Sequence, residues 1–433
     1  MRTLAIIGSG PAGFYTAEAA LKTFGEDVRC DIIDRLPTPY GLIRAGVAPD
    51  HQSIKAVSRR YEAVATDARV RFVGNVTIGE DVSVEELTGL YDDVVLAIGA
   101  PLDKPLGVPG SELPGVMGSA AFVGWYNGHP DFHDRVPPMA VEGAVIVGNG
   151  NVAIDCARIL AKTVGELSDS DIVGDALMPD LRSGLRRVHI LGRRGPHQAS
   201  FTLKEVGELG ELELATPLVR PEDFPPVEAD AALETGQRRV VEVLRKFAAA
   251  GPDPEKRVVV QLDFFHRPLK VLGNGRVEAI EVMRTRLDAD GRAVDTGETE
   301  IIPCGLVVAA IGYRTSPVPG VPYDTDAGRF ANVDGLISDG LWCVGWARRG
   351  PSGTIGTNRP DGFALVERLA AVERSGGKPG PAGLDALLAG RKVKVAYFAD
   401  WQKIDALEVS RARPGAPREK IATLDELRRV IAD

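Results

Sequence analysis

The sequence predicts an α/β protein with two Rossmann-like domains, the second inserted into the chain of the first. Near the amino terminus an apolar strand at 4–7 runs into a glycine-rich turn and then an apolar helix, and this pattern returns at 145–160. An apolar strand ending in Ile-Gly follows each copy, at 93–100 and 306–312. A chain of 433 residues is also longer than one average domain.

The first glycine-rich turn, residues 8–13, has the spacing Gly-x-Gly-x-x-Gly. In this motif Gly8 allows the tight turn, Gly10 lets the backbone approach a pyrophosphate, and Gly13 lets the helix pack close to the strand. The helix amino terminus then faces the anion. A strand at 29–33 ends in Asp34, whose carboxylate can accept a hydrogen bond from an adenosine ribose hydroxyl, although the same residue type also forms turns.

The second turn, residues 148–153, is the Gly-x-Gly-x-x-Ala variant. The strand after it, 187–192, ends in Arg193 and Arg194 where the first copy has Asp34. Paired guanidinium groups can bind a 2′-phosphate with charge-assisted hydrogen bonds, whereas a carboxylate repels it. The alternative is an exposed surface pair. We therefore predict FAD in the first site and NADPH in the second.

Composition and charge narrow the function classes. The formal net charge of −9 argues against general nucleic-acid binding or attraction to an anionic membrane surface. No run approaches the roughly 18 apolar residues of a membrane span. The first strand begins at residue 4, which leaves no room for a signal or transit peptide, so a cytoplasmic protein is expected.

The four cysteines are scattered, without the Cys-x-x-Cys spacing of a metal site or a redox-active dithiol. We expect no metal, and four buried thiols.

Breaker residues and periodicity suggest the domain boundaries. Residues 101–114 are rich in proline and glycine and mark a linker. A strand at 341–344 leads into a Gly-rich loop and a helix at 360–373, and there the chain is expected to return to the first domain. The expected limits are 1–103 and 327–433 for the FAD domain and 104–326 for the inserted NADP domain.

Other elements are predicted from shorter patterns. Helices are expected at 53–66, 201–209 and 234–250, short strands at 70–72, 76–78, 258–262 and 277–282, and a polar connection with helical pieces at 168–182.

An ordered series of motifs resembles the adrenodoxin reductase family and its bacterial relatives, the NADPH-ferredoxin reductases of the adrenodoxin reductase type. The matching segments extend over most of the chain and lie at 8–15, 41–44, 46–51, 122–128, 148–155, 192–196 and from 345 onward. Each segment is weak alone, and the series is specific. The resemblance implies FAD in the first domain, NADPH in the inserted domain and a ferredoxin as electron acceptor.

The resemblance also implies site residues. It implies FAD contacts at Ala12, Asp34, Leu42, Val76, Trp346, Gly353, Thr354 and Ile355, and NADPH contacts at Asn149, Gly150, Asn151, Val152, Arg193, Arg194, Glu205 and Gly353. Two positions depart from the mitochondrial members. Asn149 replaces glutamine and keeps an amide, and Gly207 replaces a basic residue that docks the partner. Trp346 has the alternative of a core side chain.

The chemistry needs no nucleophile. NADPH delivers two electrons as hydride, a ferredoxin accepts one at a time, and a flavin connects the two kinds of transfer. The resemblance places His51 and Asp155 near the flavin ring, where they are predicted as catalytic residues for proton exchange or tuning. For His51 the alternative is a hydrogen-bonding role within its Pro-Asp-His turn.

A helix at 234–250 carries the basic residues Arg238, Arg239, Arg245 and Lys246. They are predicted to dock an acidic ferredoxin, with a solvated face neutralised by Glu242 as the alternative.

The function predicted is that of an NADPH-ferredoxin reductase, a flavoprotein oxidoreductase. A disulfide reductase is disfavoured because no dithiol motif follows either glycine turn. A diaphorase, a flavin monooxygenase and a non-catalytic nucleotide-sensing subunit are the alternatives.

Overall fold

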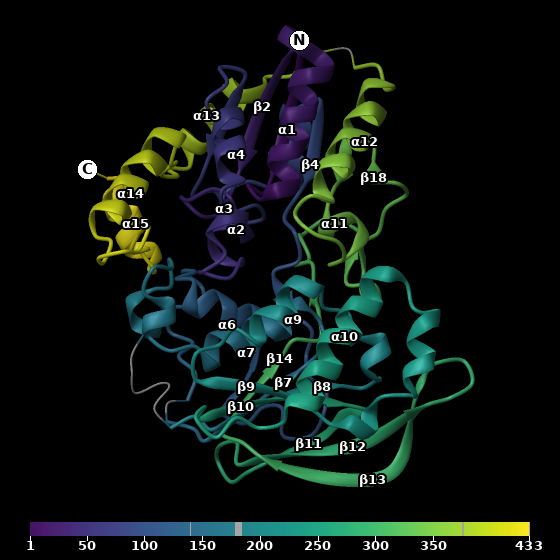
Figure 1. The fold of residues 1–433 in the computed structure, drawn as a ribbon. Coiled ribbons are helices and arrows are strands. Elements are labelled where there is room, and N and C mark those ends of the chain that lie inside the picture. Colours follow the sequence, from purple (N-terminus) through teal and green to yellow (C-terminus); the bar gives the residue numbers. More distant parts are fainter. Residues whose placement is uncertain (139, 178–183, 375, 433) are drawn as a thin grey trace. The chain divides into compact units, whose positions relative to one another are not determined.

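The computed structural model describes residues 1–138, 140–177, 184–374 and 376–432. These form two compact units. Unit 1 comprises residues 1–102, 127–130 and 313–433, and unit 2 comprises residues 103–126 and 131–312. In Figure 1 the purple amino-terminal and yellow carboxyl-terminal segments belong to unit 1, while most of the teal middle of the chain belongs to unit 2. The predicted fold class, two Rossmann-like domains with one inserted into the other, is confirmed.

Unit 1 contains a six-stranded sheet in the order β18-β19-β4-β1-β2-β3. Its strands are β1 (Arg2–Ile7), β2 (Val28–Ile33), β3 (Val70–Val73), β4 (Asp93–Leu96), β18 (Leu336–Ser338) and β19 (Leu341–Cys343). All neighbours are parallel except the edge strand β18. The carboxyl-terminal part of the chain therefore completes a sheet that the amino-terminal part begins.

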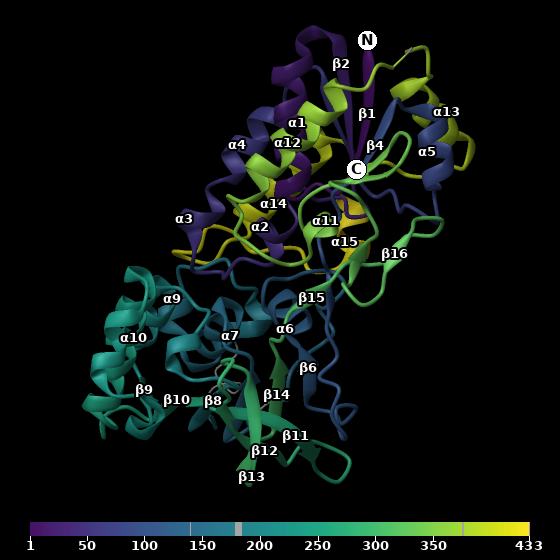
Figure 2. The ribbon, with the colours of Figure 1, turned by 90° about the vertical axis from the view of Figure 1, so that its right-hand side faces the viewer.

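Helices cover both faces of this sheet. They are α1 (Pro11–Phe24), α2 (Leu42–Ala45), α3 (Gln52–Lys55), α4 (Ser58–Ala65), α5 (Val84–Leu90), α11 (Trp346–Arg349), α12 (Asn358–Ala370), α13 (Gly380–Gly390), α14 (Phe398–Ser410) and α15 (Leu424–Val430). Helices α1 and α12 lie side by side (Figure 2), and a Cβ at Gly362 would come within 2.9 Å of the Thr16 amide nitrogen. Glycine is what lets the two backbones approach this closely.

Unit 2 contains a second six-stranded parallel sheet, in the order β6-β14-β7-β8-β10-β9. Its strands are β6 (Val116–Gly118), β7 (Gly143–Val147), β8 (Arg187–Gly192), β9 (Ala215–Val219), β10 (Val258–Phe264) and β14 (Leu306–Ala309). The helices around it are α6 (Ser119–Tyr126), α7 (Asn151–Ala161), α9 (Leu203–Leu209) and α10 (Thr235–Ala250). Its strands are buried on both faces, as parallel strands between helices are.

A three-stranded antiparallel sheet, also in unit 2, was not predicted as a sheet. It consists of β11 (His266–Leu272), β12 (Ala279–Leu287) and β13 (Ala293–Pro303). Only the segment 277–282 was expected to be a strand. Most of β13 is exposed and rich in threonine and acidic residues, so it lacks the apolar alternation that marks a strand in sequence.

The remaining short elements complete the chain. The strands are β5 (Leu102–Asp103), β15 (Tyr313–Arg314), β16 (Tyr323–Asp324) and β17 (Arg329–Phe330). Single 3₁₀ turns are η1 (Gly25–Asp27), η2 (Gly165–Leu167), η3 (Gly174–Leu177), η4 (Pro196–Gln198), η5 (Pro221–Asp223) and η6 (Val227–Ala232). The chain re-enters unit 1 at Tyr313, earlier than the position 327 expected. Residues 178–182 of the predicted polar connection lie outside the described residues.

Two predicted elements were wrong. The helix expected at 53–66 is two helices, α3 and α4, because i→i+3 hydrogen bonds around Ala56 and Val57 tighten the backbone between them. The strand expected at 76–78 is absent from the sheet. Asn75 has a φ of +59°, which turns the chain, and the Val76 amide then donates to the Asp34 carbonyl.

All four cysteines are free and buried, as predicted. Burial raises the pKa of Cys30, Cys304 and Cys343 to about 12, so these thiols stay protonated at neutral pH. Within the described part of the chain, every helix is too short or too polar to cross a membrane.

A buried ion pair ties α14 to α2. Arg44 donates to both carboxylate oxygens of Glu408, whose side chain is fully buried, and its guanidinium lies 5.1 Å from the Trp401 ring. The Ile421 amide donates to Glu408 Oε1 at 2.8 Å. Burial alone would raise the pKa of Glu408, but Arg44, the Ile421 amide and Arg418 outweigh it and hold the pKa below its usual value.

Replacing Glu408 by glutamine should lower the free energy of unfolding by about 3 kcal/mol, because Arg44 would stay buried without its counter-charge. The matched control is Glu426→Gln, which breaks an exposed pair with Arg411 and should cost less than about 1 kcal/mol. Urea denaturation measures both, and equal losses would contradict the assignment. Because the folded pKa of Glu408 is lowered, the pair stabilises the protein above the unfolded-state pKa and this stability is lost as the pH falls through the folded pKa.

Candidate functional site

The glycine turn at residues 8–13, here called the first cradle, joins β1 to α1. Gly8 has a φ of +110°, and a Cβ there would lie 2.5 Å from the Ala97 carbonyl oxygen. A Cβ at Gly13 would lie 2.0 Å from the Gly8 carbonyl oxygen. At Gly10 a Cβ would meet no other heavy atom of the described residues within 4 Å. Gly8 and Gly13 are thus required by the protein itself, whereas Gly10 leaves open space on the side that a ligand would approach.

Asp34 stands at the carboxyl end of β2, beside the first cradle. Its Oδ2 accepts hydrogen bonds from the Ser9 amide at 2.9 Å and from the Ser9 hydroxyl at 2.5 Å. Its Oδ1 accepts from the Leu36 amide at 3.0 Å, so the carboxylate also forms the turn that was the alternative interpretation. The carboxylate is thereby held rigidly, with acceptor sites left for a ribose hydroxyl.

The loop after β2 lies against the first cradle. The Tyr40 amide donates to the Ser9 carbonyl at 3.0 Å, and a Cβ at Gly41 would come 3.1 Å from the Gly10 Cα. Leu42 is 48% exposed and offers an apolar surface next to the cradle. Val76 is fully buried, and its amide donates to the Asp34 carbonyl at 3.0 Å.

The glycine-rich segment that follows β19 begins at Gly345 and packs against the start of α1. Gly345 has a φ of +67°, and a Cβ there would lie 2.6 Å from the Ala12 Cβ. Asp361 fixes this turn by accepting hydrogen bonds from the Gly345 amide at 2.8 Å and from Arg348 at 2.6 Å. Sequence reasoning missed Asp361. An acidic residue in the first turn of a predicted helix was the available signal.

Trp346 is not a core residue. It is only partly buried, its Nε1 donates to the Ser352 carbonyl at 3.0 Å, and its ring stacks on Tyr313 with centroids 6.2 Å apart. Gly353, with a φ of +81°, and Thr354 are exposed, and Ile355 is partly buried. These residues precede α12, whose first amides donate to carbonyls of the same turn, as in the 3.2 Å hydrogen bond from the Asn358 amide to the Ile355 carbonyl.

The turn at residues 148–153, here called the second cradle, joins β7 to α7. Gly148 has a φ of +138°, and a Cβ there would lie 2.2 Å from the Ala310 carbonyl oxygen. The Asn149 carbonyl accepts from the amide and hydroxyl of Ser200 at 3.1 and 2.5 Å. Asn151 Oδ1 accepts from the Thr202 amide at 2.8 Å. The segment after β8 thus fixes the second cradle, and Gly150 and Val152 follow in the same turn.

Arg193 and Arg194 lie at the carboxyl end of β8, and both are exposed. Among the described residues neither has a carboxylate within ion-pair distance. This distinguishes them from most arginines of the structure, such as Arg158, Arg284 and Arg349, which are paired. Two unpaired guanidinium groups at the end of the second strand of a Rossmann unit are suited to bind a phosphate dianion.

Glu205 lies in the first turn of α9, close in sequence to Thr202. Its Oε2 is buried and has no hydrogen-bond partner within the described part of the chain. A buried carboxylate oxygen without a donor costs free energy, so a donor from a bound molecule would complete it.

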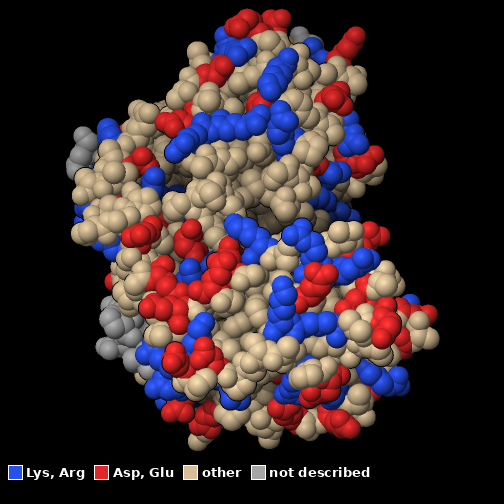
Figure 3. Space-filling view, in the orientation of Figure 1, with Lys and Arg blue, Asp and Glu red and all other residues tan. Residues whose placement is uncertain are grey.

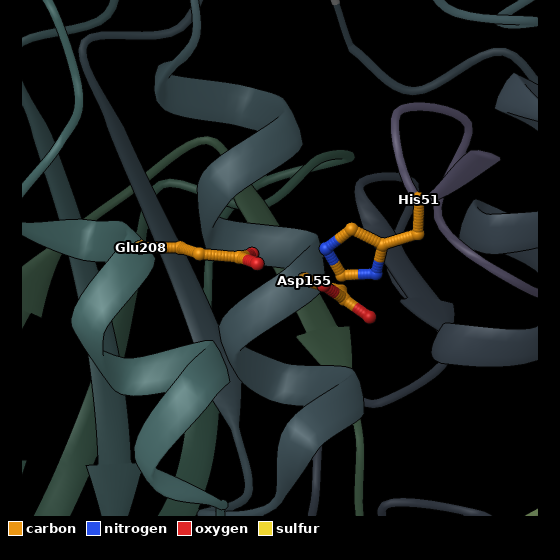
Figure 4. A group of neighbouring side chains, drawn as sticks. All are labelled: His51, Asp155 and Glu208. Carbon is orange, nitrogen blue, oxygen red and sulfur yellow. The ribbon is translucent and has the colours of Figure 1, made fainter. Parts of the chain in front are cut away.

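The two predicted catalytic residues belong to different units. Asp155 on α7 accepts from the guanidinium of Arg158 at 2.8 Å, and Arg158 also lies 3.1 Å from Glu208 Oε2 on α9. Arg158 is almost fully buried, so it requires these carboxylates. Figure 4 shows Asp155 and Glu208 projecting from their helices. His51, also labelled there, is a buried residue of unit 1 at the amino-terminal cap of α3.

The predicted docking residues on α10 separate into two pairs. Arg238 donates to the backbone carbonyls of residues 230, 231 and 233, and Arg245 binds both oxygens of Asp230. Arg239 and Lys246 are exposed. Acceptors from residues 230–233 therefore engage Arg238 and Arg245, and the docking role of the four residues stays a prediction. On the face drawn in Figure 3, basic and acidic side chains are interleaved over much of the surface.

Two glycine cradles, one beside a fixed carboxylate and the other beside two unpaired arginines, define an oxidoreductase of the class that binds two dinucleotides. In agreement, the family model for pyridine nucleotide-disulphide oxidoreductases matches residues 2–337.

Full-length relatives narrow this class. NADPH-ferredoxin reductase FprA of Mycobacterium tuberculosis is 41% identical over 449 residues, which cover 99% of this chain and 98% of the relative. Human mitochondrial NADPH:adrenodoxin oxidoreductase is 41% identical over 452 residues, which cover 99% of this chain and 91% of the relative. The structure of Mycobacterium tuberculosis FprA in complex with NADPH matches with a TM-score of 0.94 and 40% identity over all of both chains. The chain belongs to the adrenodoxin reductase and FprA family of NADPH-ferredoxin reductases.

Proposed function

We propose that this protein is a flavoenzyme that oxidises NADPH and passes the electrons one at a time to a ferredoxin. The observation that carries the proposal is the difference in charge at two equivalent strand ends. Asp34 follows β2 in unit 1, whereas Arg193 and Arg194 follow β8 in unit 2. Only the second site is suited to a dinucleotide with a 2′-phosphate. Membership of the reductase family supports the same assignment.

Unit 1 is proposed to hold FAD. The open side of Gly10 and the amino terminus of α1 suit the pyrophosphate, and Asp34 suits the adenosine ribose. Further contacts are proposed for Ala12, Leu42, Val76, Trp346, Gly353, Thr354 and Ile355. The exposed Leu42 and the half-buried Trp346 supply apolar surface suited to a flavin ring.

Unit 2 is proposed to hold NADPH. The second cradle, with Asn149 to Val152, suits the pyrophosphate, and Arg193 and Arg194 suit the 2′-phosphate. The unpartnered Oε2 of Glu205 is proposed to accept a hydrogen bond from the bound nucleotide. When bound, the flavin accepts a hydride and releases electrons singly, so the protein has to bind and orient the two nucleotides and keep water out.

His51 and Asp155 are proposed to adjust protonation at the reaction centre. His51 is buried at the amino-terminal end of α3, and an imidazole can hold or release a proton at a ring nitrogen. Asp155 is held in place by its ion pair with the buried Arg158. Neither residue is needed for hydride transfer itself, so their effect is expected on rates and on pH dependence.

An acidic ferredoxin is the proposed partner, and Arg239 and Lys246 on α10 are the proposed part of its dock. With a net charge of −9 the protein as a whole repels an acidic partner, so a local basic patch would have to guide association. The cytoplasmic location stays a prediction.

Anaerobic titration of the flavin-loaded protein with NADPH and with NADH tests the function. We expect bleaching of the flavin absorbance by NADPH at lower concentration than by NADH, followed by recovery on addition of oxidised ferredoxin. A nucleotide-sensing subunit would show no bleaching. A monooxygenase would consume oxygen with a substrate, and a diaphorase would reduce ferricyanide but not ferredoxin.

Gly10→Ala should remove most of the bound flavin while changing the unfolding free energy of the apoprotein by no more than about 1 kcal/mol. The added methyl group meets no protein atom, so only a ligand can oppose it. The control is Gly89→Ala in α5, whose Cβ would also lie in open space. The flavin-to-protein absorbance ratio measures the effect, and a Gly10→Ala protein with full flavin would contradict the assignment.

Arg193→Ala with Arg194→Ala should lower kcat/KM for NADPH about 100-fold or more and leave that for NADH nearly unchanged, because two charge-assisted interactions with the 2′-phosphate are lost. The control pair is Arg186→Ala with Arg187→Ala, two exposed arginines at the opposite end of β8. Steady-state kinetics with both nucleotides measures the preference, which should survive only in the control.

His51→Gln should change the pH profile of flavin reduction by NADPH and of electron transfer to ferredoxin, because glutamine donates a hydrogen bond but does not titrate. Stopped-flow absorbance across pH measures both steps, with the exposed His133→Gln as control. Identical profiles for wild type and His51→Gln would refute a role for His51.

Ferredoxin-mediated cytochrome c reduction should fall as salt is added, and Arg239→Ala with Lys246→Ala should flatten this dependence by removing steering charge. Arg292→Ala, at a side chain 78% exposed in the turn before β13, is the control. If the double variant keeps the wild-type dependence on salt, the docking role of Arg239 and Lys246 is contradicted.

A further inference from the structure

The antiparallel sheet β11-β12-β13 contacts the segment that carries the two arginines. We call residues 193–198 the arginine loop. Thr285, on β12, donates its hydroxyl to the Arg193 carbonyl at 2.8 Å. Phe265, between β10 and β11, donates its amide to the Arg194 carbonyl at 3.2 Å. The Thr285 amide in turn donates to the Phe265 carbonyl at 2.8 Å, so the two residues act as one support.

The support contains a strained residue. Phe265 has a φ of +58°, a left-handed conformation that is unfavourable for a bulky residue. Its ring packs beside Gly195, where a Cβ would come 2.5 Å from the ring carbon Cζ. The buried His266 stabilises the bend by hydrogen bonding through Nδ1 to the Phe264 carbonyl at 2.6 Å. A strained backbone that the surroundings maintain is typical of a segment that positions functional groups.

These contacts determine the direction in which the two arginine side chains extend from the backbone. The carbonyls of Arg193 and Arg194 belong to the two peptide planes that flank Arg194, and both are held. On the other side of Arg193, Gly192 is paired with Phe264 in the parallel sheet. With the planes fixed, the Cα–Cβ bonds of both arginines have set directions, and a smaller loss of conformational entropy accompanies phosphate binding.

We propose that this antiparallel sheet sets the preference for a 2′-phosphorylated nucleotide by fixing the arginine loop, with Thr285 as a positioning residue. The proposal rests on the proposed function of Arg193 and Arg194. Thr285 is 4% exposed and its hydroxyl donates to the Arg193 carbonyl, so it acts on the arginine loop through that carbonyl.

The test measures ligand binding by calorimetry on the flavin-loaded enzyme, with 2′,5′-ADP and 5′-AMP as probes. Thr285→Val removes the hydroxyl and should weaken 2′,5′-ADP about three- to tenfold, with 5′-AMP unchanged. Thr285→Ser keeps the hydroxyl and should bind both as the wild type does. The matched control is Thr216→Val on β9, a buried threonine of the same unit whose hydroxyl has no hydrogen-bond partner in the described structure.

Kinetics provide a second readout. Thr285→Val should raise KM for NADPH by a similar factor, with kcat and the KM for NADH unchanged. If Thr285→Val does not accumulate as folded enzyme, Thr285→Ala replaces it with the same expectation. A variant that weakens 2′,5′-ADP and 5′-AMP equally would assign Thr285 a merely structural role and overturn the proposal.

Two variants distinguish a failure of the proposed function from a failure of the inference about Thr285. If the double variant Arg193→Ala with Arg194→Ala keeps its preference for 2′,5′-ADP over 5′-AMP, the proposed function of the arginines is wrong. If that variant loses the preference while Thr285→Val keeps it at the wild-type value, the arginines bind the phosphate and the inference about Thr285 fails.

Discussion

Each six-stranded sheet has a glycine of positive φ directly after the strand that leads into its cradle. A carbonyl oxygen from another segment of the protein occupies the place where a side chain would lie. At Gly8 that oxygen belongs to Ala97, and at Gly148 it belongs to Ala310. Any side chain would push the glycine turn away from the strand beside it. Glycine at these two positions therefore lets each cradle lie close to the segment beside it, at the carboxyl end of its strand.

Different parts of the charged residues are held in place at the two cradles. In unit 1 the Asp34 carboxylate is held by Ser9 and by its own turn, so the negative charge has a fixed place. In unit 2 the guanidinium groups are exposed, and it is their backbone that is held. In unit 1 the carboxylate itself is fixed, whereas in unit 2 the hydrogen bonds fix the peptide groups that carry the arginines.

The elements that sequence could predict are those with strong local signals. Both glycine motifs, the strands at 93–96 and 306–309 and the long helix α10 follow from spacing and periodicity. The antiparallel sheet could not be read in the same way, because β13 is mostly exposed and its pairing depends on distant residues. The break at Ala56 and the turn at Asn75 are set by backbone hydrogen bonds that leave no pattern in the sequence.

The residues of the candidate site likewise fall into those that local motifs predict and those that depend on contacts between distant segments. Asp34 and the arginine pair were found from motif spacing, and their roles stay predictions. The support by Thr285 and Phe265, and the loss of Arg238 and Arg245 to the preceding turn, depend on contacts between segments whose pairing no short motif announces.

The return of the chain to unit 1 also fixes an order of events during synthesis. Unit 2 ends at Gly312, but the sheet of unit 1 lacks β18 and β19 until residue 343, and Arg44 lacks its counter-charge until Glu408 has been made. Unit 2 therefore has all its residues while unit 1 is still missing β18, β19 and the helices α11 to α15. The domain that begins at the amino terminus is the last to be finished on the ribosome, and a nucleotide can be enclosed there only after most of the chain has emerged.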